Sequence, residues 1–416
     1  MKKIVVVLFT GVLFYGCETT VASSCGDGIQ NGTELGIDCG GDCPPCASFT
    51  IEGHAQKGPF LNGSSVLLSA LDSNLNQIGT TYNTQILDNS GYFQYTANNL
   101  PSPYVALRAD GFYFNEVCGT PSDAQITLNT VTNLNNVPAV NINTLTHLEK
   151  ARVEYLVSNG MDFMSAKSKA LKEILAVFSI DTTGTMPTSE TLSIANSSTA
   201  DGILIAITSI LQGYRSESEF SDLMANIVTD MRTDGILNST TVASLLMSHA
   251  QILDTNTIRQ NIIDRYDAMG ITVNVPFFGA HIQNYVNNSP HVATTSVIGY
   301  PESGLNGLNF LNTTDSIYSD YDFHSLVTVR PSECVSLRLV IEKISGSCQY
   351  GCFFYSVSSV QNWNISSYDQ TTNSQTYIST GITTDLSIGF EPGRYRFKIY
   401  LNGATVPNRV KTIFVN

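Results

Sequence analysis

The spacing of apolar residues changes twice along this 416-residue chain, and that change constrains the fold more than any other feature. Residues 49–130 and 295–416 alternate apolar with polar side chains, as half-buried β-strands do. Between 140 and 290, apolar residues recur every three or four positions, as at Leu223 and Ile227, which indicates helices. The sequence therefore predicts a multidomain α+β protein with an N-terminal β-sandwich, a central all-α domain of about six helices, and a C-terminal β-sandwich.

Composition narrows the class of protein further. Hydrophobic residues make up 42% of the chain and charged residues only 13%, so we expect folded domains with buried cores. The formal net charge is −14. A surface of that sign repels a phosphate backbone, so we expect no nucleic-acid partner.

Residues 1–16 have the pattern of a cleaved export signal. Two lysines precede an apolar run from Ile4 to Tyr15, which is shorter than the about 20 residues that a membrane-spanning helix needs. The segment Leu13–Cys17 resembles a bacterial lipobox, which implies cleavage before Cys17 and acylation of that cysteine, with palmitate among the chains. An ordinary secretory signal is the alternative. We expect a lipid-anchored protein of the bacterial cell envelope, in the outer membrane.

Nine cysteines agree with an oxidising compartment. Apart from Cys17 they leave an even number of candidates for disulfides, namely Cys25, Cys39, Cys43, Cys46, Cys118, Cys334, Cys348 and Cys352. Four of them crowd residues 25–46, which hold too few apolar residues for a core, so residues 17–48 should form a lipid anchor and a disulfide-stapled stalk. Zinc is the alternative, but the spacing lacks the two close pairs of a zinc ribbon. The pairing stays open: one C-terminal cysteine must reach Cys118 or remain free.

The same segment resembles a short cysteine-rich motif that follows the lipidated cysteine in many bacterial surface lipoproteins. The resemblance rests on the Asp-Gly, Asn-Gly and Asp-Cys-Gly-Gly steps and on the closing Cys-Pro-Pro-Cys. Its residues Asp27, Asn31, Glu34 and Asp38 could offer oxygens to a structural Ca²⁺, and we expect no other cofactor. Hydrogen bonding to the backbone of turns is the commoner use of Asn and Asp next to Gly, and we expect that use here.

Residues 49–130 resemble a carboxypeptidase-regulatory-like, or prealbumin-like, β-sandwich. The resemblance covers about residues 50–118 and rests on Gly53–Phe60, Leu71, Asp72, Gly79, Asp88 and Gly91. Domains of this family carry no peptidase chemistry. The resemblance therefore implies a scaffold or a binding module.

In the helical region, residues 140–290, the sequence indicates helix boundaries more clearly than it indicates a functional site. Ser165, Ser239 and Thr255 can begin helices by accepting backbone N–H groups. The opening segment, Val140–Arg152, resembles a segment without known function in bacterial lipoproteins. Within it, His147 and Glu149 lie two positions apart and hence on different helix faces, so we interpret His147 as a hydrogen-bonded structural histidine.

Residues 295–416 favour an immunoglobulin-like or jelly-roll β-sandwich. Within them Tyr318, Tyr321, Trp363 and Tyr368 lie among Ser, Asn and Asp, a mixture suited to contacts with a sugar or a protein. The alternative is that these aromatic residues fill the faces of sheets.

Together these patterns favour a non-catalytic cell-envelope lipoprotein that acts as a surface or periplasmic binding, adhesion or scaffold protein. Its partners would be membrane lipid, through the acylated N-terminus, and a glycan or protein ligand. A secreted glycan hydrolase with its cleft in the helical region, flanked by β modules, is the alternative. A glycosidase needs only two carboxylates, and the chain has 35 acidic residues, whereas motifs of serine hydrolases, zinc proteases and nucleotide-binding loops are absent from the sequence.

Overall fold

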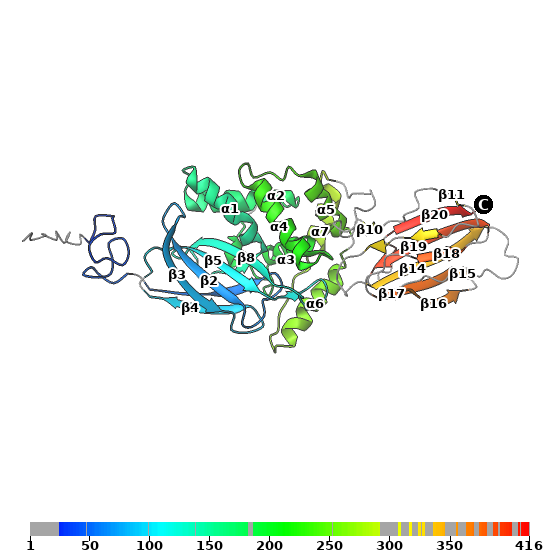
Figure 1. The fold of residues 1–416 in the computed structure, drawn as a ribbon, viewed down its shortest axis with the longest axis horizontal. Coiled ribbons are helices and arrows are strands. Elements are labelled where there is room, and N and C mark those ends of the chain that lie inside the picture. The colour runs from blue at the N-terminus through cyan, green and yellow to red at the C-terminus, as the bar shows by residue number, and fades with distance from the viewer. Residues whose placement is uncertain are drawn as a thin grey trace, which may run out of the picture. The chain divides into compact units, whose positions relative to one another are not determined.

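The computed structural model describes residues 25–46, 48–98, 100–137, 139–181, 186–251 and 253–291, and beyond them mainly the strands named below. Within the described residues the chain is α+β, with N-terminal β-sheets, seven α-helices and C-terminal strands in that order (Figure 1). The described residues up to Phe49, together with residues 97–102, form one compact unit, and the remaining residues form another. The cysteine-rich segment is therefore a unit of its own.

Two disulfides hold this cysteine-rich unit together, as the sequence predicts. Cys25 is bonded to Cys43, and Cys39 is bonded to Cys46. Oxidised sulfur atoms are not thiolates, so they cannot supply the four ligands of a zinc site. The zinc alternative for this segment is therefore wrong.

Two sheets form the N-terminal β region. Their strand orders are β4-β1-β9 and β3-β2-β5-β8. The strands are β1 (Phe49–Gln56), β2 (Ser65–Leu71), β3 (Gln77–Gln85), β4 (Tyr92–Ala97), β5 (Tyr104–Gly111), β8 (Ile126–Asn133) and β9 (Ile142–Asn143), and a separate hairpin pairs β6 (Phe114–Asn115) with β7 (Thr120–Pro121). In β5 the alternate residues Val105, Leu107 and Ala109 are buried, because successive side chains of a strand point to opposite faces.

Seven α-helices follow within the described residues, one more than the sequence predicts. They are α1 (Thr144–Ser158), α2 (Phe163–Val177), α3 (Thr199–Gln212), α4 (Glu217–Met231), α5 (Thr240–Ala250), α6 (Thr255–Asp267) and α7 (Gly279–Asn288), with a 3₁₀ turn, η1, at Ser189–Thr191. Helix α3 is buried on all sides from Asp201 to Gln212, since its central run is apolar all round. None of the helices in the described part of the chain is long and apolar enough to cross a bilayer.

Polar side chains begin six of these helices. The residues that cap them by accepting a backbone N–H of the first turn are Asn143, Asp162, Ser198, Ser216, Ser239 and Asp254. Ser239 caps α5, which confirms that prediction. The predictions for Ser165 and Thr255 are wrong. Asp162 caps α2 by accepting the Ser165 N–H at 3.0 Å, and Asp254 caps α6 by accepting the Thr257 N–H at 3.2 Å. Asp and Ser cap helices about equally well, so the local sequence could not decide between them.

Helices α1 and α2 share a hydrophobic core with the β3-β2-β5-β8 sheet (Figure 1). Val131 of β8 packs in one buried cluster with Val153 and Leu156 of α1 and with Phe163 and Ala166 of α2. Each of these side chains is at most 7% exposed. Burial of this apolar surface fixes the two helices on the sheet.

The described C-terminal strands form three sheets. The largest has the order β11-β20-β19-β14-β17-β16, from β11 (Ser316–Ile317), β14 (Ser336–Ser345), β16 (Trp363–Asp369), β17 (Ser374–Thr380), β19 (Gly393–Leu401) and β20 (Arg409–Val415). In the other two, β10 (Gly307–Leu308) pairs with β13 (Val327–Thr328), and β18 (Leu386–Gly389) lies between β12 (Phe323–Ser325) and β15 (Tyr355–Ser356). Tyr395 and Phe397 of β19 are buried and Arg394 is exposed, which confirms the alternation predicted there.

Candidate functional site

The four polar residues of the cysteine-rich unit that could bind Ca²⁺ are engaged by its turns. Asp38 accepts the backbone N–H groups of residues 26–28 at 2.8–3.1 Å. Asp27 accepts a hydrogen bond from the side chain of Asn31 at 2.8 Å, and Glu34 accepts the Asn31 backbone N–H at 3.0 Å. Asp38 and Glu34 therefore satisfy turn backbone, and Asp27 also does so by accepting the Ile29 N–H at 2.9 Å.

Cys25, Glu34 and Cys43 place their possible ligand atoms within 4.8 Å of one another. A thiolate pair with a carboxylate at that spacing would suit a metal ion. The two sulfur atoms are bonded to each other, however, so neither is a thiolate. In the oxidised protein these three residues therefore hold the fold of the unit and form no metal site.

The structure describes only some of the remaining predicted site residues. Cys17, Tyr318, Tyr321, Cys334, Cys348 and Cys352 lie outside the described residues. Cys118 is disulfide-bonded and is not a free thiol. Trp363 and Tyr368 both lie on β16, one of the two edge strands of the six-stranded sheet. Recognition of a ligand by these aromatic residues stays a prediction.

The sequence indicates no partner for Glu149, but the structure places this residue in a buried ionic cluster. Lys167 of α2 contacts Glu149 of α1, and its Nζ lies 2.8 Å from Glu190 of η1. Ser189 contacts Glu149, and Thr132 of β8 donates a hydrogen bond to Glu190 at 2.9 Å. The three charged side chains are only 1–3% exposed. These five residues, here called the Lys167 cluster, tie the sheet to two helices.

Burial and charge act in opposite directions within the Lys167 cluster. Burial raises the pKa of Glu149 to about 7, against the attraction of Lys167. Burial alone would also raise the pKa of Glu190, but the charge of Lys167 and its hydrogen bond bring that pKa below its usual value. Burial disfavours the Lys167 ammonium, yet the two carboxyl groups outweigh it and raise its pKa. Near neutral pH the cluster therefore holds an ammonium, a carboxylate and a second carboxyl group, Glu149, that is partly protonated.

The last residue of β1, Gln56, and the next residue, Lys57, make a second set of buried polar contacts. Lys57 donates to both carboxylate oxygens of Glu116 at 2.7 and 2.8 Å, and the two side chains are 0% and 2% exposed. Gln56 donates to the Tyr266 hydroxyl at 3.2 Å and accepts the Ile194 backbone N–H at 3.1 Å. These bonds fix the end of β1 to α6 and to the segment before α3.

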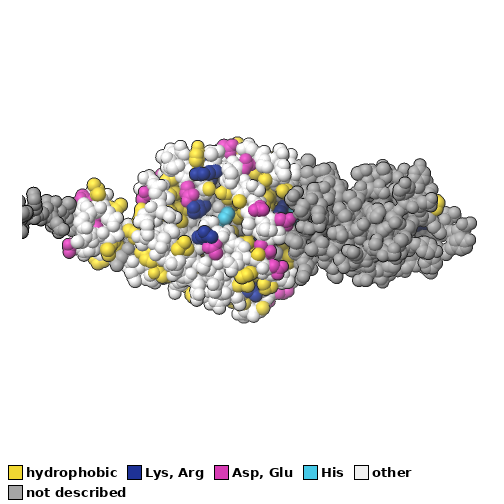
Figure 2. All heavy atoms as spheres, viewed as in Figure 1, with side chains coloured by type: hydrophobic (Ala, Val, Ile, Leu, Met, Phe, Trp, Pro, Cys, Tyr) yellow, Lys and Arg dark blue, Asp and Glu magenta, His cyan; other side chains and the backbone are white. Residues whose placement is uncertain are grey.

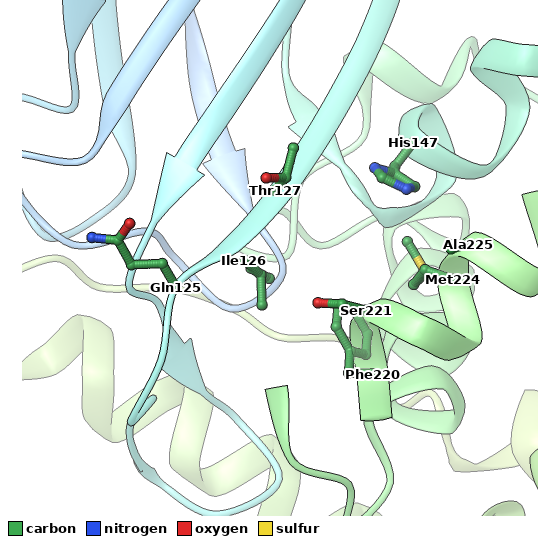
Figure 3. A pocket seen from close by; sticks show the side chains of 8 residues that line it. All are labelled: Gln125, Ile126, Thr127, His147, Phe220, Ser221, Met224 and Ala225. Carbon is green, nitrogen blue, oxygen red and sulfur yellow. The ribbon is translucent and has the colours of Figure 1, made fainter. Parts of the chain in front are cut away.

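A small open pocket lies between β8, α1 and α4 (Figure 3). Its volume is about 230 Å³, and it is lined by Gln125, Ile126, Thr127, His147, Phe220, Ser221, Met224 and Ala225. Ile126, Phe220 and Met224 are at most 3% exposed and form an apolar floor. We call this the His147 pocket. Sites for small molecules usually measure about 300–1,000 Å³, so this one is sized for a single small group.

His147 is the titratable side chain among the residues that line this pocket. Its Nδ1 lies 3.4 Å from the side-chain nitrogen of Asn129, which can only donate, so Nδ1 accepts and the ring proton is assigned to Nε2. Burial, and then the charge of Lys150, lowers the pKa of His147 to about 4. The imidazole is therefore neutral at physiological pH.

Charged side chains close to the pocket residues are paired with one another. Thr127 donates to Asp110, and Asp110 also binds Arg108 at 2.8 Å. Lys150, which lies one turn beyond His147 on α1, contacts Glu154 at 2.5 Å. In the space-filling view, basic and acidic side chains and a histidine lie together on one face of the sheet and helices (Figure 2). The pocket is thus lined by neutral polar groups, and the ion pairs Arg108–Asp110 and Lys150–Glu154 lie near it.

No family model, no curated protein and no solved structure matches this chain. The family resemblances noted in its sequence therefore stay predictions. The Lys167 cluster and the His147 pocket are identified from the geometry of this chain alone.

Proposed function

We propose that this protein is a non-catalytic lipoprotein of the bacterial cell envelope, anchored through Cys17, that binds a glycan or protein partner at the cell surface or in the periplasm. The export signal and the cysteine at its end support the anchor. The disulfides Cys25–Cys43 and Cys39–Cys46 support the compartment, because such bonds persist outside the reducing cytosol.

In this proposal the N-terminal β region is a prealbumin-like β-sandwich and the C-terminal region is an immunoglobulin-like or jelly-roll β-sandwich. The sheets of three and four strands support the first assignment. The sheets of six and three strands support the second. Rigid β scaffolds of this kind carry binding residues on their edges and connecting loops.

The observation that most favours binding over catalysis is the state of His147 in its pocket. With a pKa of about 4, its imidazole offers hydrogen bonds but is a poor proton acceptor near pH 7. The other polar lining residues, Gln125, Thr127 and Ser221, are uncharged amides and alcohols. Together with the apolar floor they suit one uncharged unit that bears hydroxyl or amide groups, such as a terminal sugar or a neutral protein side chain.

Filling the pocket tests this proposal. Ala225→Phe places a ring at the exposed rim of the His147 pocket and should abolish binding to any glycan or protein that the wild-type protein retains on a glycan array or on immobilised extracellular proteins. Ala280→Phe is the matched control, because Ala280 is also an exposed alanine on a helix, α7, and it should bind like wild type.

Two results would contradict the proposal. Equal binding by wild type and Ala225→Phe would exclude this pocket as the binding site. Turnover of a polysaccharide that one carboxylate-to-amide substitution abolishes would show instead a glycan hydrolase.

A further inference from the structure

The Lys167 cluster brings together the three groups that amide formation needs. An amine can attack a carboxyl group, and a second carboxylate beside it can take up the proton that the ammonium must lose. Lys167 contacts Glu149 and also lies 2.8 Å from Glu190, so one nitrogen touches both carboxyl groups. All three side chains are at least 97% buried.

Glu149 has the features of the group that is attacked. Its Oε1 contacts both Lys167 and the Ser189 hydroxyl, whereas its Oε2 is buried without a hydrogen-bond partner. A buried carboxylate oxygen without a partner is costly, and protonation removes part of that cost. This agrees with the raised pKa of Glu149, about 7, at which a large fraction of the group is a carboxylic acid near neutral pH. The Ser189 hydroxyl is placed to polarise the carbonyl oxygen under attack.

Glu190 has the features of the proton acceptor. It faces Lys167 from η1, and the Thr132 hydroxyl fixes its other oxygen at 2.9 Å. Its pKa lies below the usual value because Lys167 outweighs the effect of burial, so it stays ionised when Glu149 is protonated. The two carboxyl groups are therefore in different protonation states, as a general base and an electrophile require.

We propose that Lys167 and Glu149 condense into an amide cross-link between α1 and α2, with Glu190 as the proton acceptor. The Lys167 ammonium first gives a proton to the Glu190 carboxylate. Its amine then forms a bond to Cδ of Glu149 and gives a second proton to the departing hydroxyl, the C–O bond to that hydroxyl breaks, and one water leaves. The products are a secondary amide, a water molecule and protonated Glu190, so atoms and charge balance and no oxidant or further reactant is needed.

Two physical effects favour this reaction in the folded chain. The fold holds amine and carboxyl in contact, which replaces a bimolecular encounter by a step within one molecule. The product also replaces a buried ammonium and carboxylate by neutral groups, which removes the desolvation cost of keeping two charges in the core. The cross-link would join residues 18 positions apart in the sequence, and reducing agents could not break it.

The Lys57–Glu116 pair shows why we do not expect the same reaction there. Both oxygens of Glu116 accept hydrogen bonds from Lys57, so that carboxylate has no unpartnered oxygen. Burial lowers the pKa of Lys57, but the described contacts place no second carboxylate against its Nζ. This pair is equally buried and serves as a matched control.

Mass spectrometry of the intact, full-length mature protein tests the proposal. The wild-type protein should be lighter by the mass of one water than its sequence, acylation and oxidised cysteines require. After proteolysis, the peptides that contain Lys167 and Glu149 should be recovered as one covalently linked species. Glu190→Gln should restore the full mass, whereas Glu116→Gln should leave the loss of one water unchanged.

Wild-type protein at its full mass, with separate Lys167 and Glu149 peptides, would overturn the proposal. A loss of water that persists in folded Glu190→Gln would overturn the role of Glu190. Circular dichroism establishes whether that variant is folded; if it is not, the peptide map of the wild-type protein alone decides whether the cross-link exists.

Discussion

At the scale of single residues, the chain buries several of its few charged side chains. Lys57, Lys167, Glu149 and Glu190 are each at most 3% exposed, although only 13% of the sequence is charged. Lys57 contacts Glu116, and Lys167 contacts both Glu149 and Glu190, because an isolated buried charge would be costly. These pairs lie where strands and helices meet. They therefore favour one packing arrangement of the strands and helices over others.

A second residue-scale feature is His249, which is fully buried and neutral. Its Nδ1 accepts the backbone N–H of Tyr214 at 3.1 Å, an interaction that protonation of the ring would break. Burial, and then the charge of Arg215, holds the pKa of His249 well below 6.5. Gly213, with φ +48°, lies directly against this ring and leaves no room for a Cβ.

We predict that His249 makes the protein less stable in acid. The unfolded chain binds a proton at this residue more tightly than the folded protein does, so the free energy of unfolding should fall as the pH drops below about 6.5. Urea denaturation at about pH 7 and about pH 5 measures this fall. His249→Asn, whose oxygen can still accept the Tyr214 N–H, should lower stability at neutral pH but weaken its pH dependence; an unchanged pH dependence would contradict the assignment.

At the scale of elements, the residue that caps α1, Asn143, also makes hydrogen bonds to a distant segment of the chain. Asn143 accepts the Thr146 backbone N–H at 3.0 Å, and the Thr146 hydroxyl accepts the Asn143 N–H in return. The same Asn143 side chain donates to the carbonyl oxygens of Ser189 and Leu192. One residue thus begins α1 and positions the η1 turn that carries Glu190.

We predict that Asn143→Ala destabilises the protein by about 2 kcal/mol or more, because it removes the cap and leaves buried carbonyl groups without a donor. Ser239→Ala is the matched control. Ser239 caps α5 through one backbone N–H, so its loss should cost about 1 kcal/mol. Urea unfolding of both variants measures the difference, and equal losses would show that the contacts of Asn143 with η1 add nothing.

At the scale of the whole molecule, the cysteine-rich unit and the body of sheets and helices are separate compact units. The unit depends on its two disulfides, because its apolar side chains Ile29, Leu35 and Ile37 are more than half exposed. The body depends on its own hydrophobic core and buried polar contacts. If the protein is anchored through Cys17 as proposed, its membrane attachment and the stability of the body should therefore be separable.

We predict that Cys17→Ser moves the protein from the membrane fraction to the soluble fraction without changing the thermal unfolding of the body. In the proposed lipoprotein the acyl chains on Cys17 are the anchor, and the cysteine-rich unit that follows this residue is a compact unit distinct from the body. The control is Cys25→Ser with Cys43→Ser, which should stay in the membrane fraction and gain protease cleavage sites only within residues 25–46. Cell fractionation and limited proteolysis make the comparison, and a Cys17→Ser protein that stays with the membrane would exclude lipidation as the anchor.

The sequence by itself determined the order of β, α and β regions, the cap at Ser239, and disulfides in the cysteine-rich segment. The spacing of hydrophobic residues, the capping residues and the density of cysteines are local signals. Each concerns the structure of residues that lie close together in the sequence. Only the tertiary structure decided that Asp162 and not Ser165 begins α2, and that Glu149, Lys167 and Glu190 meet. A charged residue on an amphipathic helix normally faces water, and its burial depends on a partner supplied by a distant segment, which no local pattern encodes.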